Sequence, residues 1–174
     1  INTDTIRKLS WIGVDIDKGY INIDSNMQTS IPGIYAIGDV TGKMLLAHVA
    51  SAQGVFVVES IAGLTPTVLD YDLMPRAIYC HPQVASFGLT ENQAREKGYE
   101  LNIGRFPLSA SGKAIAMGET EGMVKVVAEK EIGDILGVHM IGSEVTELLG
   151  EIGMARMLES TTEELGWLTH PHPT

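Results

Sequence analysis

The sequence predicts an α+β domain with a mostly antiparallel sheet flanked by helices, preceded by a strand and a helix of α/β type. Two apolar runs, residues 123–129 and 135–141, are separated by a turn around Gly133, which favours an antiparallel hairpin. Grouped strands flanked by helices are typical of α+β folds. Upstream, the apolar run 34–37 precedes a Gly–Asp pair and a long apolar stretch, as a strand followed by a helix does.

Composition limits the class of protein. The chain has 174 residues, 44% of them hydrophobic and 20% charged, which is typical of a globular protein with a core. A net charge of −10 disfavours nucleic acid and anionic membranes as partners. Cys80 is the only cysteine, so no disulfide can form within the chain, and we expect it in the core of a cytoplasmic protein. Residues 1–20 lack the pattern of a signal peptide.

The first part of the chain is expected to form a strand at 19–24 with one wet face and a buried strand at 34–37. Residues 45–62 lack proline and are apolar nearly all round, which predicts a helix packed on several sides. Polar residues interrupt this stretch, so we interpret it as a buried helix and not a membrane span.

The Gly38–Asp39 pair lies between this predicted strand and helix. Gly38 would let a ligand approach the backbone, while Asp39 would face the first amides of the helix. A carboxylate beside a helix amino terminus suits a ligand with hydroxyls and a group that becomes negative. The alternative is that Asp39 only caps the turn.

The second part is predicted element by element. Pro66 and Pro75 frame a connector, and strands are expected at 76–79, 84–88 and 100–108. Thr90 and Gln93 form a capping box for a helix that ends at Gly98. An irregular or helical link is expected over 109–117.

Two helices are expected after the hairpin. Ser143 is predicted to cap the first, which has an apolar face, and Thr161 and Glu164 signal the second. The members of the apolar face are Val145, Leu148, Leu149, Ile152, Met154, Met157 and Leu158. The edge formed by the last three is also consistent with a surface for a partner helix.

The histidines call for separate interpretations. His170 and His172 each precede a proline, which holds the backbone extended. A metal site would need further ligands, and none are clustered nearby, so we expect no metal. A general acid or base is more plausible than a metal site, but the residues alone favour an exposed, frayed terminus. His139 is expected to be structural.

Several segments together resemble the carboxyl-terminal part of the dihydrolipoamide dehydrogenases, in the flavin-linked pyridine nucleotide-disulfide oxidoreductase family. They are residues 31–40, 44–48, 79–82, 87–90 and 170–174. The resemblance implies that residues 1–64 close an FAD-binding domain. It also implies that residues 65–174 form the interface domain of a homodimer, without its carboxyl-terminal end.

The resemblance also implies roles for single residues. Asp39 matches the carboxylate that binds the FAD ribityl chain, next to Gly38. Leu45, Leu46 and Ala47 match the helix start that faces the flavin. His172 matches the base that deprotonates the substrate thiol, with a bond to Pro173 that can be cis. The family passes electrons from dihydrolipoamide through a redox disulfide and FAD to NAD, and lipoyl-bearing multienzyme components are possible partners.

The chain departs from the family pattern in three ways. It has neither a Gly-x-Gly-x-x-Gly motif nor a cysteine pair, and it stops before the glutamate expected five residues after His172. The resemblance thus implies half an FAD site, and we expect the chain to be inactive alone. Two alternatives to a dihydrolipoamide dehydrogenase remain. The chain is either the same part of a glutathione or mercuric reductase, or a non-catalytic dimerisation module.

Overall fold

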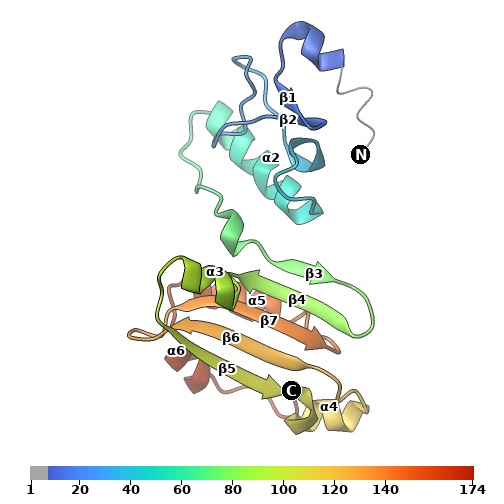
Figure 1. Cartoon of the computed structure of the whole chain (residues 1–174), viewed down its shortest axis with the longest axis vertical. Helices are drawn as coiled ribbons and strands as arrows, with labels where there is room; N and C mark the ends of the chain where they lie inside the picture. The colour runs from blue at the N-terminus through green and yellow to red at the C-terminus, as the bar shows by residue number, and fades with distance from the viewer. Residues whose placement is uncertain (1–7) are drawn as a thin grey trace. The chain divides into compact units, whose positions relative to one another are not determined.

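The computed structural model describes residues 8–174, which divide into two compact units after Tyr71 (Figure 1). Among its described residues, the first unit contains one α-helix and one short hairpin. Its elements are η1 (Lys8–Ile12), β1 (Ile16–Asp17), β2 (Tyr20–Ile21), η2 (Gly38–Thr41) and α2 (Ala47–Ile61), followed by η3 (Tyr71–Leu73).

The predicted strand at 19–24 is reduced to the two residues of β2. Lys18 and Gly19 both have positive φ and connect β1 to β2 in a tight turn. The strand then ends because the Asp24 carboxylate accepts hydrogen bonds from the backbone N–H groups of Asn26 and Gln28, at 2.8 and 2.9 Å. This local turn competes with a longer ladder.

The prediction of a buried strand at 34–37 is wrong. The segment forms a single antiparallel bridge between Gln28 and Tyr35. Hydrogen bonds from the Thr29 N–H to the Ile34 carbonyl and from the Ala36 N–H to the Met27 carbonyl complete this pairing. The other edge has no strand beside it within the described residues, and the side chains of Ile34 and Ile37 are about two-fifths exposed.

Helix α2 buries one face and not several. Val49, Gln53, Phe56 and Val57 are buried at spacings of four, three and one, as expected for one helical stripe. The opposite side carries an exposed stripe of Val55, Val58 and Ile61. The apolar residues all round this helix predicted that other segments would pack against several of its faces. Among the described residues, other segments pack against only one face.

The second unit is built on a five-stranded antiparallel sheet in the order β3-β4-β7-β6-β5. This confirms the predicted α+β class and the hairpin of β6 and β7. The elements are β3 (Arg76–Ile78), β4 (Gln83–Gly88), α3 (Glu91–Glu96), β5 (Leu101–Pro107), η4 (Leu108–Ala110), α4 (Gly112–Met117), β6 (Met123–Glu129), β7 (Ile135–Gly142), α5 (Leu149–Met157) and α6 (Thr162–Trp167).

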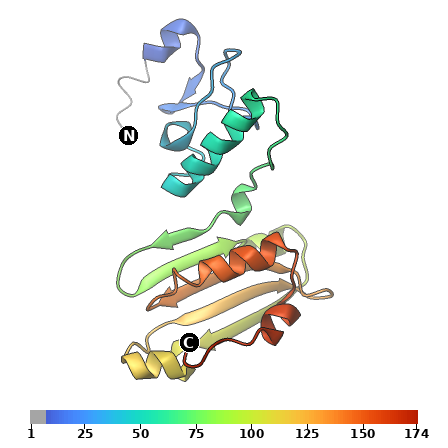
Figure 2. The same cartoon turned by 180° about the vertical axis from the view of Figure 1, so that it is seen from behind.

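Helices cover both faces of this sheet. Figure 1 shows α3 in front of the strands, and the reverse view in Figure 2 shows α5 and α6 in front. Under α5, the sheet residues Ile135 and Val138 are fully buried against Val145 and Leu149. Under α3, Ala94 packs with Val127 and Leu136. Burial on both faces makes the sheet the core of this unit.

The helix signals in this unit were mostly correct. Both predicted capping boxes are present, Thr90 with Gln93 and Thr161 with Glu164, and Gly98 has a φ of +88° after α3. Ser143, however, does not cap α5. Turns occupy 143–148, and the helix begins at Leu149 with no side-chain cap.

The delayed start of α5 has two causes in the turn. Glu144 has a φ of +59°, which a right-handed helix cannot include. The Thr146 hydroxyl also donates a hydrogen bond of 2.8 Å to the Gln83 side chain, which holds the turn against β4. The contact with β4 joins residues 63 apart in the sequence, so no local pattern reports it.

Cys80 is exposed, contrary to the prediction that it lies in the core. The reason is that β3 ends at Ile78 and Cys80 lies in the loop to β4.

No helix within residues 8–174 has the length and apolar character needed to cross a membrane.

Candidate functional site

The corner between η2 and α2 contains the predicted ligand-binding residues. Gly38 begins η2 with a φ of +75°, and a Cβ added there would lie 3.2 Å from the Cβ of Ala50 on α2. Both the backbone conformation and the close approach favour glycine. Gly38 therefore lets η2 lie against the first half of α2.

Both backbone polar groups of Gly38 are held by buried side chains. Its N–H donates a hydrogen bond of 2.6 Å to the Gln53 side-chain oxygen, and its carbonyl accepts one of 2.8 Å from the Thr41 hydroxyl. The Gln53 side-chain nitrogen donates to the Tyr71 hydroxyl at 2.8 Å. Gln53 is fully buried, and we missed its role because it looked like a polar interruption of an apolar helix.

Asp39, in contrast, faces outward. It is exposed, and its carboxylate forms no hydrogen bond or ion pair with the residues that the structure describes. Leu46 occupies the N-cap position of α2 and contributes no side-chain cap. Asp39 is thus not a helix cap in this structure, which removes the alternative interpretation of its position.

The start of α2 is accessible as well. Leu45 is about half exposed, Ala47 is exposed and Leu46 is partly buried. The first N–H groups of an α-helix have no partner within the helix, and they carry partial positive charge. The corner thus joins a hydrogen-bond acceptor, the Asp39 carboxylate, to the donor end of a helix.

The predicted base belongs to the second unit. His172 is exposed, and its ring Cε1 lies 3.9 Å from the position that a Cβ on Gly112 would occupy, at the start of α4. Its peptide bond to Pro173 is cis. Pro173 and Thr174 line a hollow of about 450 Å³ with residues from β5 and α4.

The neighbouring histidines have other contacts. The Nε2 atom of His170 lies 3.0 Å from each carboxylate oxygen of Glu151 on α5. Within residues 8–174, no three His, Cys, Asp or Glu side chains are grouped so as to hold a metal ion. His139 contacts the Leu89 carbonyl at 3.0 Å through Nε2, which confirms its structural role.

A charged cluster on α3 and the sheet was not predicted. The Glu91 carboxylate lies 2.7 Å from Lys125, 3.0 Å from Arg95 and 3.1 Å from Arg105. Hydrogen bonds, first from Lys125 and then from Arg95, lower the pKa of Glu91 to about 2. The spacing of Glu91 and Arg95 is readable from sequence, but Arg105 and Lys125 meet only because β5 and β6 pair in that register.

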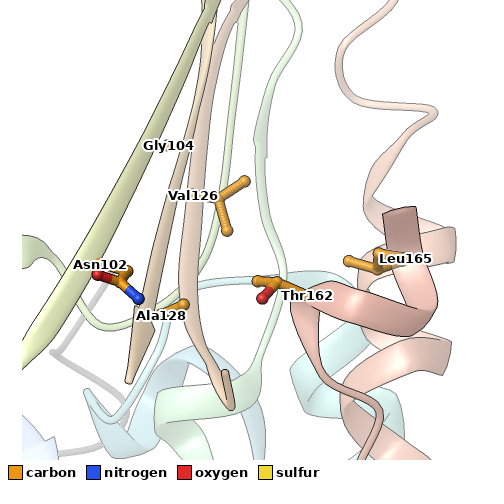
Figure 3. Close-up of a pocket in the computed structure, with 6 residues that line it drawn as sticks. All are labelled: Asn102, Gly104, Val126, Ala128, Thr162 and Leu165. Atoms are coloured by element: carbon orange, nitrogen blue, oxygen red, sulfur yellow. The ribbon is translucent and has the colours of Figure 1, made fainter. Parts of the chain in front are cut away.

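A second hollow lies between the β5–β6 pair and α6 and measures about 320 Å³ (Figure 3). Its lining carries no titratable side chain and consists of Asn102, Gly104, Val126, Ala128, Thr162 and Leu165. It therefore offers neither an acid, a base nor a charged ligand contact.

Comparison with known proteins covers both units. Residues 74–174 match the dimerisation domain of the pyridine nucleotide-disulphide oxidoreductases, and residues 2–54 match the pyridine nucleotide-disulphide oxidoreductase domain. Dihydrolipoyl dehydrogenases from Corynebacterium glutamicum and Bacillus subtilis are 50% and 49% identical over 91% of this chain. The chain spans 34% and 33% of those relatives, or about a third of their length.

Solved structures show the same fold. LpdA from Mycobacterium tuberculosis matches with a TM-score of 0.90 at 24% identity, over 99% of this chain and 38% of that one. The flavoprotein disulfide reductase RclA from Escherichia coli matches with a TM-score of 0.86 at 23% identity, over 93% and 38%. The match of the dimerisation domain covers more than half of the sequence and confirms the resemblance. The chain belongs to the pyridine nucleotide-disulphide oxidoreductase family.

Proposed function

We propose that this chain is the carboxyl-terminal part of a dihydrolipoyl dehydrogenase, which oxidises dihydrolipoamide with NAD through a redox disulfide and FAD. Identity near 50% with dihydrolipoyl dehydrogenases across nine-tenths of the chain supports the choice of substrate. FAD, when bound, accepts two electrons from the dithiol and passes them to NAD. Cys80 is the sole cysteine, so the disulfide lies outside this sequence.

The observation that carries the proposal is the open carboxylate of Asp39 on η2, an element that packs against the first half of α2. An unpartnered carboxylate can accept hydrogen bonds from the ribityl hydroxyls of FAD. The backbone at Leu45, Leu46 and Ala47 would face the flavin ring, where helix N–H groups stabilise developing negative charge. The donor set therefore fits one side of an FAD site.

His172 would serve as the base that takes the proton from the substrate thiol. An exposed imidazole suits this role, because its ring nitrogen is accessible to accept a proton from a substrate thiol. In the assembled enzyme it would serve a disulfide on the other subunit, as the resemblance implies.

Assembly into a homodimer through the second unit is part of the proposal. Met154, Met157 and Leu158 are more than half exposed at the end of α5, and such apolar clusters mark interaction surfaces. The proposal includes lipoyl-bearing components of a multienzyme complex as further partners, in the cytoplasm. Replacing Met157 with Lys should convert the dimer to monomer in sedimentation experiments, whereas the exposed Ile132→Lys should not.

The test of function uses the longest natural protein that contains this sequence. We expect it to purify with FAD and to reduce NAD with dihydrolipoamide, and Asp39→Ala to weaken flavin retention. Faster turnover with glutathione disulfide or Hg(II) would show that the proposed substrate is wrong and that the protein is a related reductase. Absence of flavin would favour a dimerisation module. The 174-residue chain alone should show no turnover with NAD, FAD and dihydrolipoamide.

A further inference from the structure

We propose that Gln53 and Tyr71 are positioning residues that orient the Gly38–Asp39 turn for its ligand. The inference rests on the proposed role of this turn in binding FAD. It assigns a function to two side chains that are remote from the turn in sequence and make no contact with the ligand in this scheme.

The central contact is a relay through one buried amide. The Gln53 oxygen accepts from the Gly38 N–H at 2.6 Å, and the Gln53 nitrogen donates to the Tyr71 hydroxyl at 2.8 Å. Gln53 has no exposed surface, so water cannot replace either bond. The donor and acceptor ends of the amide point to different partners, and the partners thus select one orientation of the side chain.

The relay and the Thr41 hydroxyl together fix the peptide groups on both sides of Gly38. Gln53 holds the N–H, and the Thr41 hydroxyl holds the carbonyl at 2.8 Å. The peptide group that leads into Asp39 cannot rotate without breaking a buried hydrogen bond. The Asp39 carboxylate, which is itself unpartnered, is thereby held by its backbone in an outward position before any ligand arrives.

The same contacts exclude another role. Since the Gly38 N–H is already bonded to a buried side chain, it is not available to donate to a ligand. Glycine is favoured at this position by its φ of +75° and by the close approach of Ala50 on α2. The Asp39 side chain, which is exposed and unpartnered, is the group of this turn that the proposal assigns to the ligand.

Tyr71, the last residue of the first unit, is linked to the corner through Gln53. Nearby, Leu69 packs on a cluster of Met27, Phe56 and Val57. The Tyr71 hydroxyl accepts the second bond of Gln53 and prevents this amide from turning away from Gly38. Removal of the hydroxyl alone, in Tyr71→Phe, therefore tests the relay without creating a large cavity.

The first experiment measures hydrogen exchange of the Gly38 amide by NMR in the 174-residue chain. Gln53→Met keeps the length of the side chain and removes the acceptor, and we expect exchange about tenfold faster or more. Gln53→Glu keeps an acceptor and should restore protection. Ser51→Ala, an exposed position on the same helix, is the control and should change nothing. Unchanged Gly38 exchange in both Gln53→Met and Tyr71→Phe would overturn the relay.

The second experiment measures FAD affinity and the bound-flavin absorption spectrum in the longest natural protein that contains this sequence. Gln53→Met and Tyr71→Phe should weaken affinity about tenfold or more and shift the spectrum, whereas Gln53→Glu should restore both. If the unmodified protein binds FAD and both variants bind it equally with the same spectrum, the positioning role is wrong but the proposed function stands. If the unmodified protein binds no FAD, the proposed function fails, and the positioning role fails with it.

Discussion

The Nε2 atom of His170 lies 3.0 Å from both carboxylate oxygens of Glu151, which joins the segment after α6 to the first turn of α5. Residues 168–174 form no helix or strand. This contact therefore anchors the backbone that carries the proposed base, His172, two residues further on.

Loss of this anchor should loosen the segment more than it destabilises the fold. For Glu151→Ala and His170→Ala, we expect a coupling free energy of about 0.2–1 kcal/mol in a double-mutant cycle, because the pair is partly exposed. Faster hydrogen exchange over residues 168–174, with unchanged exchange in β7, would support the anchor. A coupling energy of zero together with unchanged exchange would contradict it.

Acid should release the contacts of Glu91. Its folded pKa is lowered to about 2, from 4.5, so the unfolded state binds the proton more readily. The stabilisation is therefore fully present above about pH 5 and is lost as the pH falls toward 2. Urea unfolding from pH 6 to pH 2.5 should show a smaller loss of stability in Glu91→Gln than in the unmodified chain.

Glu96 provides the matched control for this experiment. It lies at the end of the same helix, is exposed, and has no ion pair among the described residues. Glu96→Gln should leave the pH dependence as it is. An equal effect of the two substitutions would show that the cluster with Lys125, Arg95 and Arg105 contributes nothing specific.

A methyl group at Gly137 should be poorly tolerated. Gly137 lies opposite Gly88 in the β4–β7 pair, and a Cβ there would overlap the backbone carbonyl of Leu89. We expect Gly137→Ala to lower the free energy of unfolding by about 2–4 kcal/mol. Gly104→Ala adds the same methyl where the closest atom is 3.9 Å away, beside the hollow in Figure 3, and should be neutral or slightly stabilising. Urea unfolding followed by circular dichroism compares the two.

The hairpin of β6 and β7 contains a pair of isoleucines that differ in burial. Ile135 has no exposed surface, whereas Ile132 in the turn is 71% exposed. Ile135→Ala should cost about 2–5 kcal/mol and Ile132→Ala less than about 0.5 kcal/mol in the same unfolding measurement. Similar costs at both positions would mean that the core does not lie beneath β7.

Local signals explain what could be predicted from sequence. The hairpin, the helix caps at Thr90 and Thr161, and the turn at Gly98 depend on residues that are neighbours in the chain. The start of α5 was misplaced because a contact from Gln83 to Thr146 opposes the local preference. The prediction of a buried strand at 34–37 was wrong for a similar reason. A buried strand needs a neighbouring strand on each side, and among the described residues this segment forms only one bridge, between Gln28 and Tyr35.

The candidate site follows the same division. Asp39 and His172 could be identified as candidates from sequence motifs. The hydrogen bond from the Gly38 N–H to a buried side chain could not be predicted in this way. It depends on Gln53 and Tyr71, which meet Gly38 only in the folded chain. The Glu91 cluster likewise requires the register of two strands.

The exposed stripe of Val55, Val58 and Ile61 on α2 has a consequence for handling the protein. Exposure of these branched aliphatic side chains to water is unfavourable. In concentrated solutions of the isolated chain, association that buries them is therefore favoured. Low protein concentration, or co-expression with a protein that covers α2, is thus the appropriate starting point for purification.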